Sequence, residues 1–536
     1  MKLTKQDIKE NCTEWRQKGF ILPEYDMDEM VRKTEKAPEW IHFGAGNIFR
    51  AYIARIADDL LKAGEMETGI IAVNNYDSES IERIYKPCDC LTLLVGLRAK
   101  GNRYYRVLGS VAKALAAKGN GLEELLKMAE KESLKMISYT ITEKGYAVKD
   151  VSGKILPPIE QDIKEGPDGN LDSVIGKTAA MLNKRYKANG RPISLVSMDN
   201  CSHNGEKLKE GVSLVIEKWA EAGLVEEGLK EYLAKKVAFP CSMIDKITPR
   251  PAETVAKELK ELGVEDMELI VTKKGTYTSA YVNAEMPQYL VIEDCFPNGR
   301  AALEKAGVYI TDLETVEKAE KMKVTVCLNP LHTALAVFGC LLGYNKISDE
   351  MEDEDLKKLV YELAYKEGIP VVPDPKIINP EDFLNEVLTE RLPNSNLPDT
   401  PQRIATDTSQ KLAVRYGETI KAWAQKEGTD KLELIPLVIA GWLRYLTAID
   451  DEGNKMELSP DPELENVCKI ITSEMVGKAE LTAEEKKEIE KLLRNKDLFG
   501  VDLCEVGLSE KIMQDFTQML KERGAVRETI SRKVNK

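Results

Sequence analysis

The stretch EWIHFGAGNIFRAYIARIADDLLKAG, residues 39–64, decides the fold of the first part of the chain. It begins with a short apolar strand and continues through the tight turn Gly44-Ala45-Gly46. From Asn47 onward its apolar residues recur with the spacing of a helix. A strand, a glycine turn and a helix form the first part of a dinucleotide-binding βαβ unit, because two glycines let the backbone approach a pyrophosphate at the helix N-terminus.

The match to the pattern G-x-G-x-x-G is partial, since Phe49 stands where the third glycine would be. A second strand at residues 69–73 follows at the distance that a βαβ unit requires. The acidic residue that usually holds the adenosine ribose should lie near the end of that strand, and Asp77 is the nearest candidate. No arginine lies close enough to suggest a 2′-phosphate pocket, so NAD is preferred to NADP.

Strands and helices continue to alternate up to a linker at residues 294–300. Strands are predicted at residues 107–111, 135–139, 192–197, 269–272 and 288–293, and helices at residues 121–133 and 171–187. TITEKGY, residues 140–146, follows a strand end, where α/β sheets place ligands, and Thr142 is therefore a candidate cofactor residue. The sequence predicts an α/β, Rossmann-type domain over residues 1–300 and a mostly α-helical domain over residues 301–536.

A polar loop directly follows the strand at residues 192–197 and carries Asp199, Asn200, His203 and Asn204. Such a cluster is expected either of a turn with a helix cap or of a binding site. Composition alone favours the cap.

The segment EKMKVTVCLNPLH, residues 320–332, carries residues suited to proton transfer. If Lys323 is buried, its pKa falls and it can act as a base near neutral pH. The amide of Asn329 can stabilise negative charge on a reacting oxygen, and His332 can fix a second hydroxyl. The alternative is that Asn329 and Pro330 only start a helix, as its N-cap and first residue.

Composition excludes several classes of function. A chain of 536 residues is too long for one core, so two domains are expected. The formal charge of −14 argues against nucleic-acid binding, because phosphate contacts need a basic surface. The polar N-terminus and the absence of an apolar run of about 18 residues predict a cytoplasmic protein with no membrane segment. The ten cysteines are scattered, with one close pair at Cys88 and Cys90, and there are three histidines, so neither a disulfide framework nor a metal site is predicted.

Seven segments of the chain together resemble the polyol-specific long-chain dehydrogenases, a family that includes mannitol 2-dehydrogenase, mannonate oxidoreductase (fructuronate reductase), tagaturonate reductase and mannitol-phosphate dehydrogenase. The segments are HFGAGNIFRA (42–51), TITEKGY (140–146), SMDNCSHNG (197–205), DKITPRP (245–251), PQYLVIED (287–294), EKMK with LNPLH (320–332) and PDTPQRIATDTSQK (398–411). They occur in the family's order, and this order makes the resemblance specific.

The resemblance implies metal-free hydride transfer between NAD and a polyol or aldonate, in a cleft between the two domains. Lys323 resembles the family's general base, and Glu320 the carboxylate that links it to solvent protons. Asn200 and Asn329 resemble the two amides that stabilise the reacting oxygen, and His332 the substrate-binding histidine.

The resemblance also assigns binding residues. Gly44, Gly46 and Arg50 match the cofactor loop, which Asn47 continues. Arg391 falls near the family's substrate-binding arginine, although residues 392–394 blur the alignment.

One spacing departs from the family. The family usually has four residues between the lysine and the asparagine, whereas here Val324 to Leu328 make five. An extra residue turns a helix by about 100°, so we expect it in a non-helical join before a new helix at Pro330. Lys321 is the alternative candidate for the base, but its spacing to Asn329 departs further from the family's spacing.

The predicted reaction is the reduction of a hexuronate, D-fructuronate, to the hexonate D-mannonate. Mannitol–fructose and altronate–tagaturonate interconversion stay open, and a phosphorylated polyol is disfavoured because no arginine cluster is evident. A non-catalytic NAD-binding protein is the alternative from another class. The sequence is compatible with a monomer or a homodimer.

Overall fold

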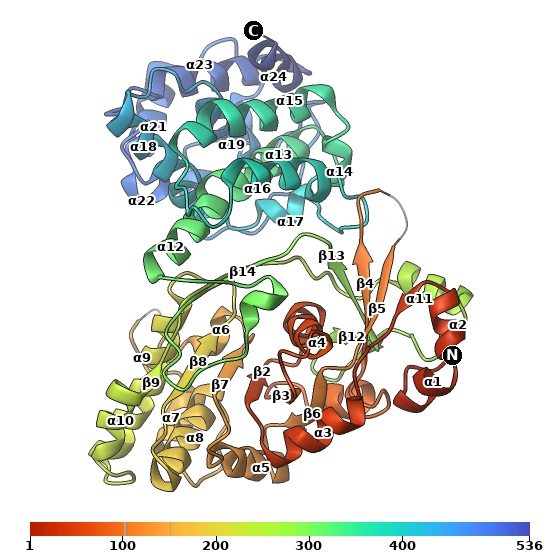
Figure 1. Ribbon diagram of the computed structural model, residues 1–536. Coiled ribbons are helices and arrows are strands. Elements are labelled where there is room, and N and C mark those ends of the chain that lie inside the picture. The colour runs from red at the N-terminus through yellow and green to blue at the C-terminus, as the bar shows by residue number, and fades with distance from the viewer. Residues whose placement is uncertain (101–102, 151, 536) are drawn as a thin grey trace. The chain divides into compact units, whose positions relative to one another are not determined.

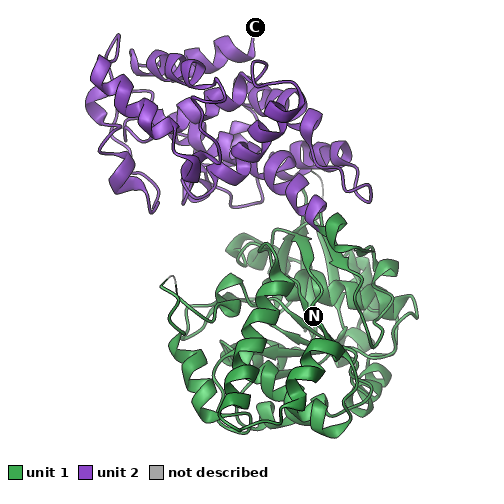
Figure 2. Cartoon of the chain, turned by 90° about the vertical axis from the view of Figure 1, so that its left-hand side faces the viewer, with its two compact units in different colours: residues 1–316 green, residues 317–536 purple. Residues whose placement is uncertain are grey.

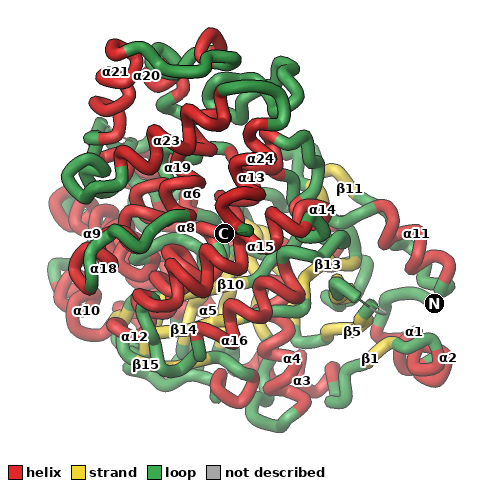
Figure 3. The backbone as a smooth tube through the Cα atoms, turned by 90° about the horizontal axis from the view of Figure 1, so that it is seen from above, coloured by secondary structure: helices red, strands yellow, loops and turns green. Residues whose placement is uncertain are grey.

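The computed structural model describes residues 1–100, 103–150 and 152–535. The chain divides into two compact units, Met1–Val316 and Glu317–Lys536 (Figure 2). Within the described residues, all strands fall in the first unit, and the second is built of helices and loops (Figure 3). The first unit is therefore α/β and the second α-helical, as the sequence predicts.

A six-stranded parallel sheet forms the centre of the first unit (Figure 1). Its strands, in spatial order, are β6 (Val111–Ala116), β3 (Ile70–Asn74), β2 (Trp40–Phe43), β7 (Met136–Tyr139), β8 (Ile193–Ser197) and β9 (Val237–Ala238). This is the strand order of a Rossmann fold, in which the chain changes sides between β2 and β7. Dinucleotides bind at such a switch point, outside the carboxyl ends of the strands.

Both faces of this sheet are covered. Ile41 and Phe43 of β2 pack into a core with the helices on one face, while Trp40 packs into a core on the opposite face. The first core includes α5 (Asn120–Ala129), α7 (Pro157–Glu165), α8 (Val174–Ala188), α9 (Asn204–Glu221) and α10 (Gly228–Lys236). The second core includes the π-helix η1 (Phe49–Ile53), α4 (Ala54–Lys62) and the π-helix η2 (Ile81–Tyr85). Burial on both faces explains why the strands read as continuous apolar runs.

Smaller elements complete the first unit. A mixed sheet contains β1 (Phe20–Ile21), β5 (Tyr104–Leu108), β4 (Thr92–Leu97) and β13 (Tyr281–Glu285); another contains β10 (Ser242–Asp245), β14 (Tyr289–Glu293) and β15 (Tyr309–Thr311); and β11 (Ile270–Val271) pairs with β12 (Tyr277–Thr278). The remaining helices are α1 (Lys5–Glu10), α2 (Cys12–Gln17), α3 (Met27–Lys36), α6 (Glu143–Tyr146) and α11 (Glu253–Glu261).

Two segments differ from the sequence-based expectation. The predicted strand at residues 107–111 is the end of β5 and the start of β6, because Gly109 and Ser110 turn the chain between them. After residue 300, β15 pairs in parallel with β14, and for this reason the first unit continues to Val316.

The second unit is built around two apolar helices, α13 (Asn329–Leu341) and α19 (Leu434–Tyr445), which are buried along nearly their whole length. They approach closely at Gly441, where a Cβ atom would lie 2.6 Å from the Phe338 ring. Around them lie α12 (Leu313–Lys321), α14 (Ile347–Glu350), α15 (Glu354–Glu362), α16 (Pro380–Glu386), α17 (Pro401–Ala405), α18 (Glu418–Lys426), α20 (Leu464–Val467), α21 (Ala483–Leu493), α22 (Lys496–Phe499), α23 (Ser509–Leu520) and α24 (Ala525–Val534).

The helical run Leu313–Leu341 is long and apolar enough to cross a membrane by length and composition alone. The structure buries 89% of its most apolar window inside the protein. Burial of this kind is typical of a core helix, so the run is weak evidence for a membrane span.

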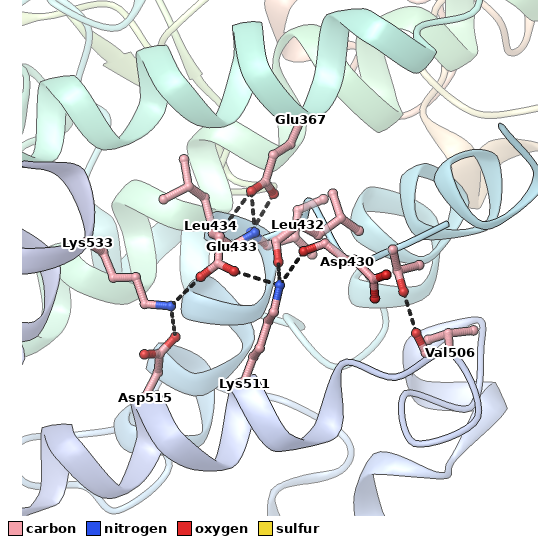
Figure 4. Close-up of polar contacts among 11 residues, drawn as sticks. Glu367, Asp430, Leu432, Glu433, Leu434, Val506, Lys511, Asp515 and Lys533 are labelled. Atoms are coloured by element: carbon pink, nitrogen blue, oxygen red, sulfur yellow. Dashed lines mark hydrogen bonds and ion pairs between the residues drawn. The ribbon is translucent and has the colours of Figure 1, made fainter. Parts of the chain in front are cut away.

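A buried carboxylate caps the N-terminus of α19 (Figure 4). Glu367 accepts hydrogen bonds from the backbone N–H groups of Glu433 (2.6 Å), Leu434 (2.6 Å) and Ile435 (2.8 Å). The Glu433 side chain in turn pairs with Lys511 and Lys533. The capping carboxylate therefore satisfies backbone donors that would otherwise be buried without partners.

Glu350, by contrast, is a fully buried carboxyl group with no hydrogen-bond partner for either oxygen among the described residues. It lies against Gly339 of α13, where an added Cβ would be 2.2 Å from Oε1. Burial raises the pKa of Glu350 well above its usual value.

The raised pKa makes stability depend on pH. A carboxyl group whose pKa is raised in the folded state contributes its full share of stability below its unfolded pKa, about 4.3. That contribution is lost as pH rises through the folded pKa, because the unfolded state releases its proton more readily than the folded state. We expect Glu350→Gln, which cannot ionise, to gain stability relative to the native chain between pH 5 and pH 8, by up to about 1.4 kcal/mol per pH unit. Urea unfolding at both pH values measures this gain, and a difference that does not change with pH would contradict it.

Candidate functional site

Predicted site residues of the first unit follow strand ends at one edge of the parallel sheet. The turn at Gly44 follows β2, the turn ending in Asp77 follows β3, Thr142 follows β7 and Asn200 follows β8. These four strands are consecutive neighbours in the sheet and run in the same direction, so their carboxyl ends meet at the switch point.

The glycine turn allows two close approaches. Gly44 has φ +109°, and a Cβ atom there would lie 2.0 Å from the carbonyl oxygen of Thr140, so only glycine fits. At Gly46 a Cβ would meet nothing within 4 Å, which leaves the backbone open. This open backbone, followed by the start of a helix at Asn47, fits a pyrophosphate.

Arg50 is buried and forms a hydrogen bond to Asn47, which follows the turn. Its guanidinium donates to the carbonyl of Ser279 (2.7 Å), the hydroxyl of Thr278 (3.2 Å) and the side-chain oxygen of Asn47 (3.0 Å). Arg50 therefore orients Asn47, and its own donors are occupied within the protein.

A chain of hydrogen bonds links His42 to the glycine turn. His42 Nδ1 lies 2.6 Å from the Ser138 hydroxyl, and Nε2 lies 2.8 Å from the Thr140 hydroxyl. Trp40 donates to Ser138, and Thr140 donates to the carbonyl of Gly44 (3.0 Å). These bonds are all satisfied if His42 is neutral with its proton on Nε2. Burial lowers the pKa of His42 to about 3, which keeps the ring neutral.

Asp199 joins the ends of β7 and β8. Its carboxylate accepts from the backbone N–H groups of Ile141 (2.7 Å) and Thr142 (3.1 Å) and from the Tyr146 hydroxyl (2.6 Å). Thr142 is held at φ +64°, which is unfavourable for a threonine. Burial raises the pKa of Asp199, which its hydrogen bonds oppose.

The polar loop after β8 divides into supporting and exposed residues. Asn204 is fully buried and bonds to the backbone of Asp199 and Ser242. Asn200 and His203 are exposed, and His203 lies 3.4 Å from Glu206. Asn204 thus holds the loop in place.

Asp77 is buried in the turn after β3. Its carboxylate accepts from the Thr272 hydroxyl (2.5 Å) and from the backbone N–H of Glu79 (3.2 Å). The carboxylate oxygens are thus engaged in fixing the turn. Its neighbour Asn75 is also held, by the ammonium group of Lys177 (2.5 Å).

In the second unit, Lys323 is buried, with 3% of its surface exposed, in the π-helix η4 (Met322–Cys327). The N–H of Leu328 donates to the carbonyl of Lys323 (3.1 Å), five residues back. A π-turn holds one residue more than an α-turn, so it accommodates the longer spacing to Asn329. The extra residue therefore lies in a wide helical turn and not, as expected, in a non-helical join.

The helix α13 begins one residue before the predicted position. Leu328 (φ −132°, ψ −63°) is the N-cap, and Asn329 is the first helical residue, with Pro330 next. The Asn329 carboxamide therefore does not cap the helix and makes no hydrogen bond within the described part of the chain. It remains available for a ligand.

His332, one turn along α13, is buried and its Nε2 has no hydrogen-bond partner among the described residues. The nearest acid is Asp399, 3.7 Å away. Burial lowers the pKa of His332 to about 4; Asp399 opposes this shift, while the charges of Arg415, Arg391 and Arg403 add to it. The structure thus gathers an arginine cluster that the sequence did not reveal, because its members lie in different elements.

Two other predicted residues of the second unit, Glu320 and Arg391, lie on helices before and after this segment. Glu320 is half-buried on α12, one turn before Lys323. Arg391 is buried at the end of the π-helix η7 (Val387–Arg391). No group of three or more potential metal ligands occurs among the described residues.

Comparisons with known proteins identify the family of the chain. Residues 38–305 match the family of the mannitol dehydrogenase Rossmann domain, and residues 315–520 the family of the mannitol dehydrogenase C-terminal domain. D-Mannonate oxidoreductase of Thermotoga maritima is 50% identical over 100% of this chain and 99% of its own.

Two solved structures are also similar. D-Sorbitol dehydrogenase in substrate-free form is 27% identical, with a TM-score of 0.78 over 96% of this chain and 97% of its own. Mannitol 2-dehydrogenase of Pseudomonas fluorescens, solved as a ternary complex with NAD and D-mannitol, is 25% identical, with a TM-score of 0.71 over 100% of both chains.

The hydrogen-bond chain at His42 generates a prediction about the glycine turn. His42→Phe keeps the ring that stacks on Phe49 but leaves two buried hydroxyls without their partner. We expect the Kd for NADH to rise about tenfold, since the turn loses its support. Fluorescence titration measures this, with the exposed His203→Asn as the matched control. Equal affinity of His42→Phe and the native chain would contradict the supporting role.

Proposed function

Because the chain belongs to the mannitol dehydrogenase family, we propose that it is a nicotinamide-dependent oxidoreductase that reduces D-fructuronate to D-mannonate. The burial of Lys323 in the π-turn that leads to Asn329 and His332 carries this proposal, because a buried lysine beside free amide and imidazole groups suits proton transfer to a carbonyl oxygen. The 50% identity with a D-mannonate oxidoreductase supports a sugar acid as the substrate.

The proposed cofactor is NAD. Its pyrophosphate would lie against the open backbone at Gly46 and the helix start at Asn47, with Gly44 and Arg50 shaping the turn. The cofactor supplies or accepts the hydride. No arginine takes part in the hydrogen bonds described at the Asn74–Asp77 turn, which favours NAD over NADP.

Each site residue has a proposed role. In the oxidation, neutral Lys323 takes the proton of the substrate hydroxyl, and in the reduction its ammonium returns that proton. Asn329 donates a hydrogen bond to the reacting oxygen and stabilises its partial negative charge. Glu320 exchanges protons between Lys323 and solvent, and His332 orients the substrate.

The first experiment is NADH oxidation, followed at 340 nm, against D-fructuronate, D-tagaturonate, D-fructose and fructose 6-phosphate, with NADPH in parallel. We expect the highest kcat/KM with D-fructuronate and NADH. A preference for D-fructose or D-tagaturonate would replace the proposed substrate. NADH binding without turnover of any sugar would favour a non-catalytic role.

Lys323 and Lys321 form a matched pair for the catalytic test, because one is buried and the other exposed two residues away. We expect Lys323→Ala to lower kcat by about 10³-fold, since it removes the proton donor and acceptor. Lys321→Ala should leave kcat unchanged. Near-normal turnover of Lys323→Ala would contradict the assignment of the base.

A further inference from the structure

Arg415 is a half-buried cation that pairs with no carboxylate among the residues that the structure describes. It lies in the π-helix η8 (Ala413–Gly417), and its Nη1 donates to the hydroxyl of Thr333. Within the described residues this is its one hydrogen bond, and no carboxylate pairs with it. Burial lowers the pKa of Arg415 to about 10.

Other buried arginines of the chain are fully engaged. Arg185 donates to five backbone carbonyls, Arg444 bonds to Met519, Thr447, Ile449 and Asp450, and Arg106 pairs with Asp58 and Asp59. The half-buried guanidinium of Arg415 makes a single hydrogen bond among the described residues, so most of its donors can bind an anion. Arg415 therefore has the properties of a ligand-binding group and lacks those of a structural one.

The position of Arg415 connects it to the proposed site. Thr333, which receives its hydrogen bond, lies one helical turn after Asn329 and donates to the Asn329 carbonyl (3.1 Å). His332 is the adjacent residue, and its Nε2 has no hydrogen-bond partner among the described residues. The guanidinium thus lies beside the N-terminal turn of α13, where the helix dipole also favours an anion.

We propose that Arg415 binds the carboxylate of the sugar acid and thereby selects hexuronates and hexonates over neutral polyols. This inference rests on the proposed function and assigns the group that recognises its substrate class. The planar guanidinium fork matches a carboxylate, and the pair is stronger than a bond to a neutral hydroxyl.

The local charge favours a carboxylate over a phosphate. Arg403 is already paired with Asp399, whereas Arg415 pairs with no carboxylate among the described residues. The single positive charge of Arg415 balances the single negative charge of a carboxylate. A phosphate dianion beside Asp399 would need more positive charge. The His332 Nε2 can bond to the hydroxyl next to the carboxylate.

The test compares Arg415→Met and Arg415→Lys with the native chain. We expect Arg415→Met to lower the ratio of kcat/KM for D-fructuronate to that for D-fructose about 100-fold, because the charge-assisted pair is lost with one substrate only. Arg415→Lys should recover part of the ratio, since it keeps the charge but not the fork. Arg494→Met, an exposed arginine of the same unit, should leave the ratio unchanged.

A second measurement is independent of turnover. D-Mannonate should raise the melting temperature of the native protein but not of Arg415→Met. Without ligand the variant should be at least as stable as the native chain, because it lacks a half-buried charge that pairs with no described carboxylate. If no sugar turns over but D-mannonate still stabilises through Arg415, the proposed reaction fails and the carboxylate site stands.

Three results would overturn the inference. Equal losses with D-fructuronate and D-fructose would give Arg415 a general role. Destabilisation of ligand-free Arg415→Met would make it a structural residue. Loss of fructose 6-phosphate turnover, with D-fructuronate turnover retained, would assign the site to a phosphate.

Discussion

A helix that changes its hydrogen-bond pattern inside a hydrophobic core must find partners for the carbonyls that it releases. This requirement organises the second unit. The Tyr416 hydroxyl donates to the carbonyl of Pro330 (2.7 Å), and the Thr419 hydroxyl donates to that of Thr325 (3.0 Å). These bonds fix residues 415–419 against the junction of η4 and α13. Arg415 is thereby held beside the start of α13. The same hydrogen bonds stabilise the junction and position the charge of Arg415.

In the first unit, backbone groups at the carboxyl ends of the strands also need hydrogen-bond partners. Strand ends leave backbone groups without ladder partners, and here buried side chains supply them. The Asp199 carboxylate binds two N–H groups after β7, and the Thr140 hydroxyl binds the carbonyl of Gly44. In this way the groups that shape the proposed cofactor turn are themselves held by hydrogen bonds with other side chains of the protein.

The sequence was sufficient for the main sheet, because β2, β3, β7 and β8 are apolar runs with clear turn signals at their ends. The lysine–asparagine–histidine segment is continuous, so the sequence alone brings these residues together as candidates. The sequence could not reveal the cluster around His332, since Asp399 and Arg415 come from segments that only folding brings to it. Nor could it reveal that Arg50 and Asp77 bond within the protein, because side-chain partners far along the chain leave no local pattern.

The π-turn at Met322–Cys327 affects how relatives of different length are aligned. A helix that gains one residue by widening a turn can keep both of its ends in place. The number of residues between the lysine and the asparagine is therefore a poor measure of their separation in space. Evolution can insert or delete a residue here without relocating either group, and an alignment that enforces constant spacing would pair Lys323 with the wrong position.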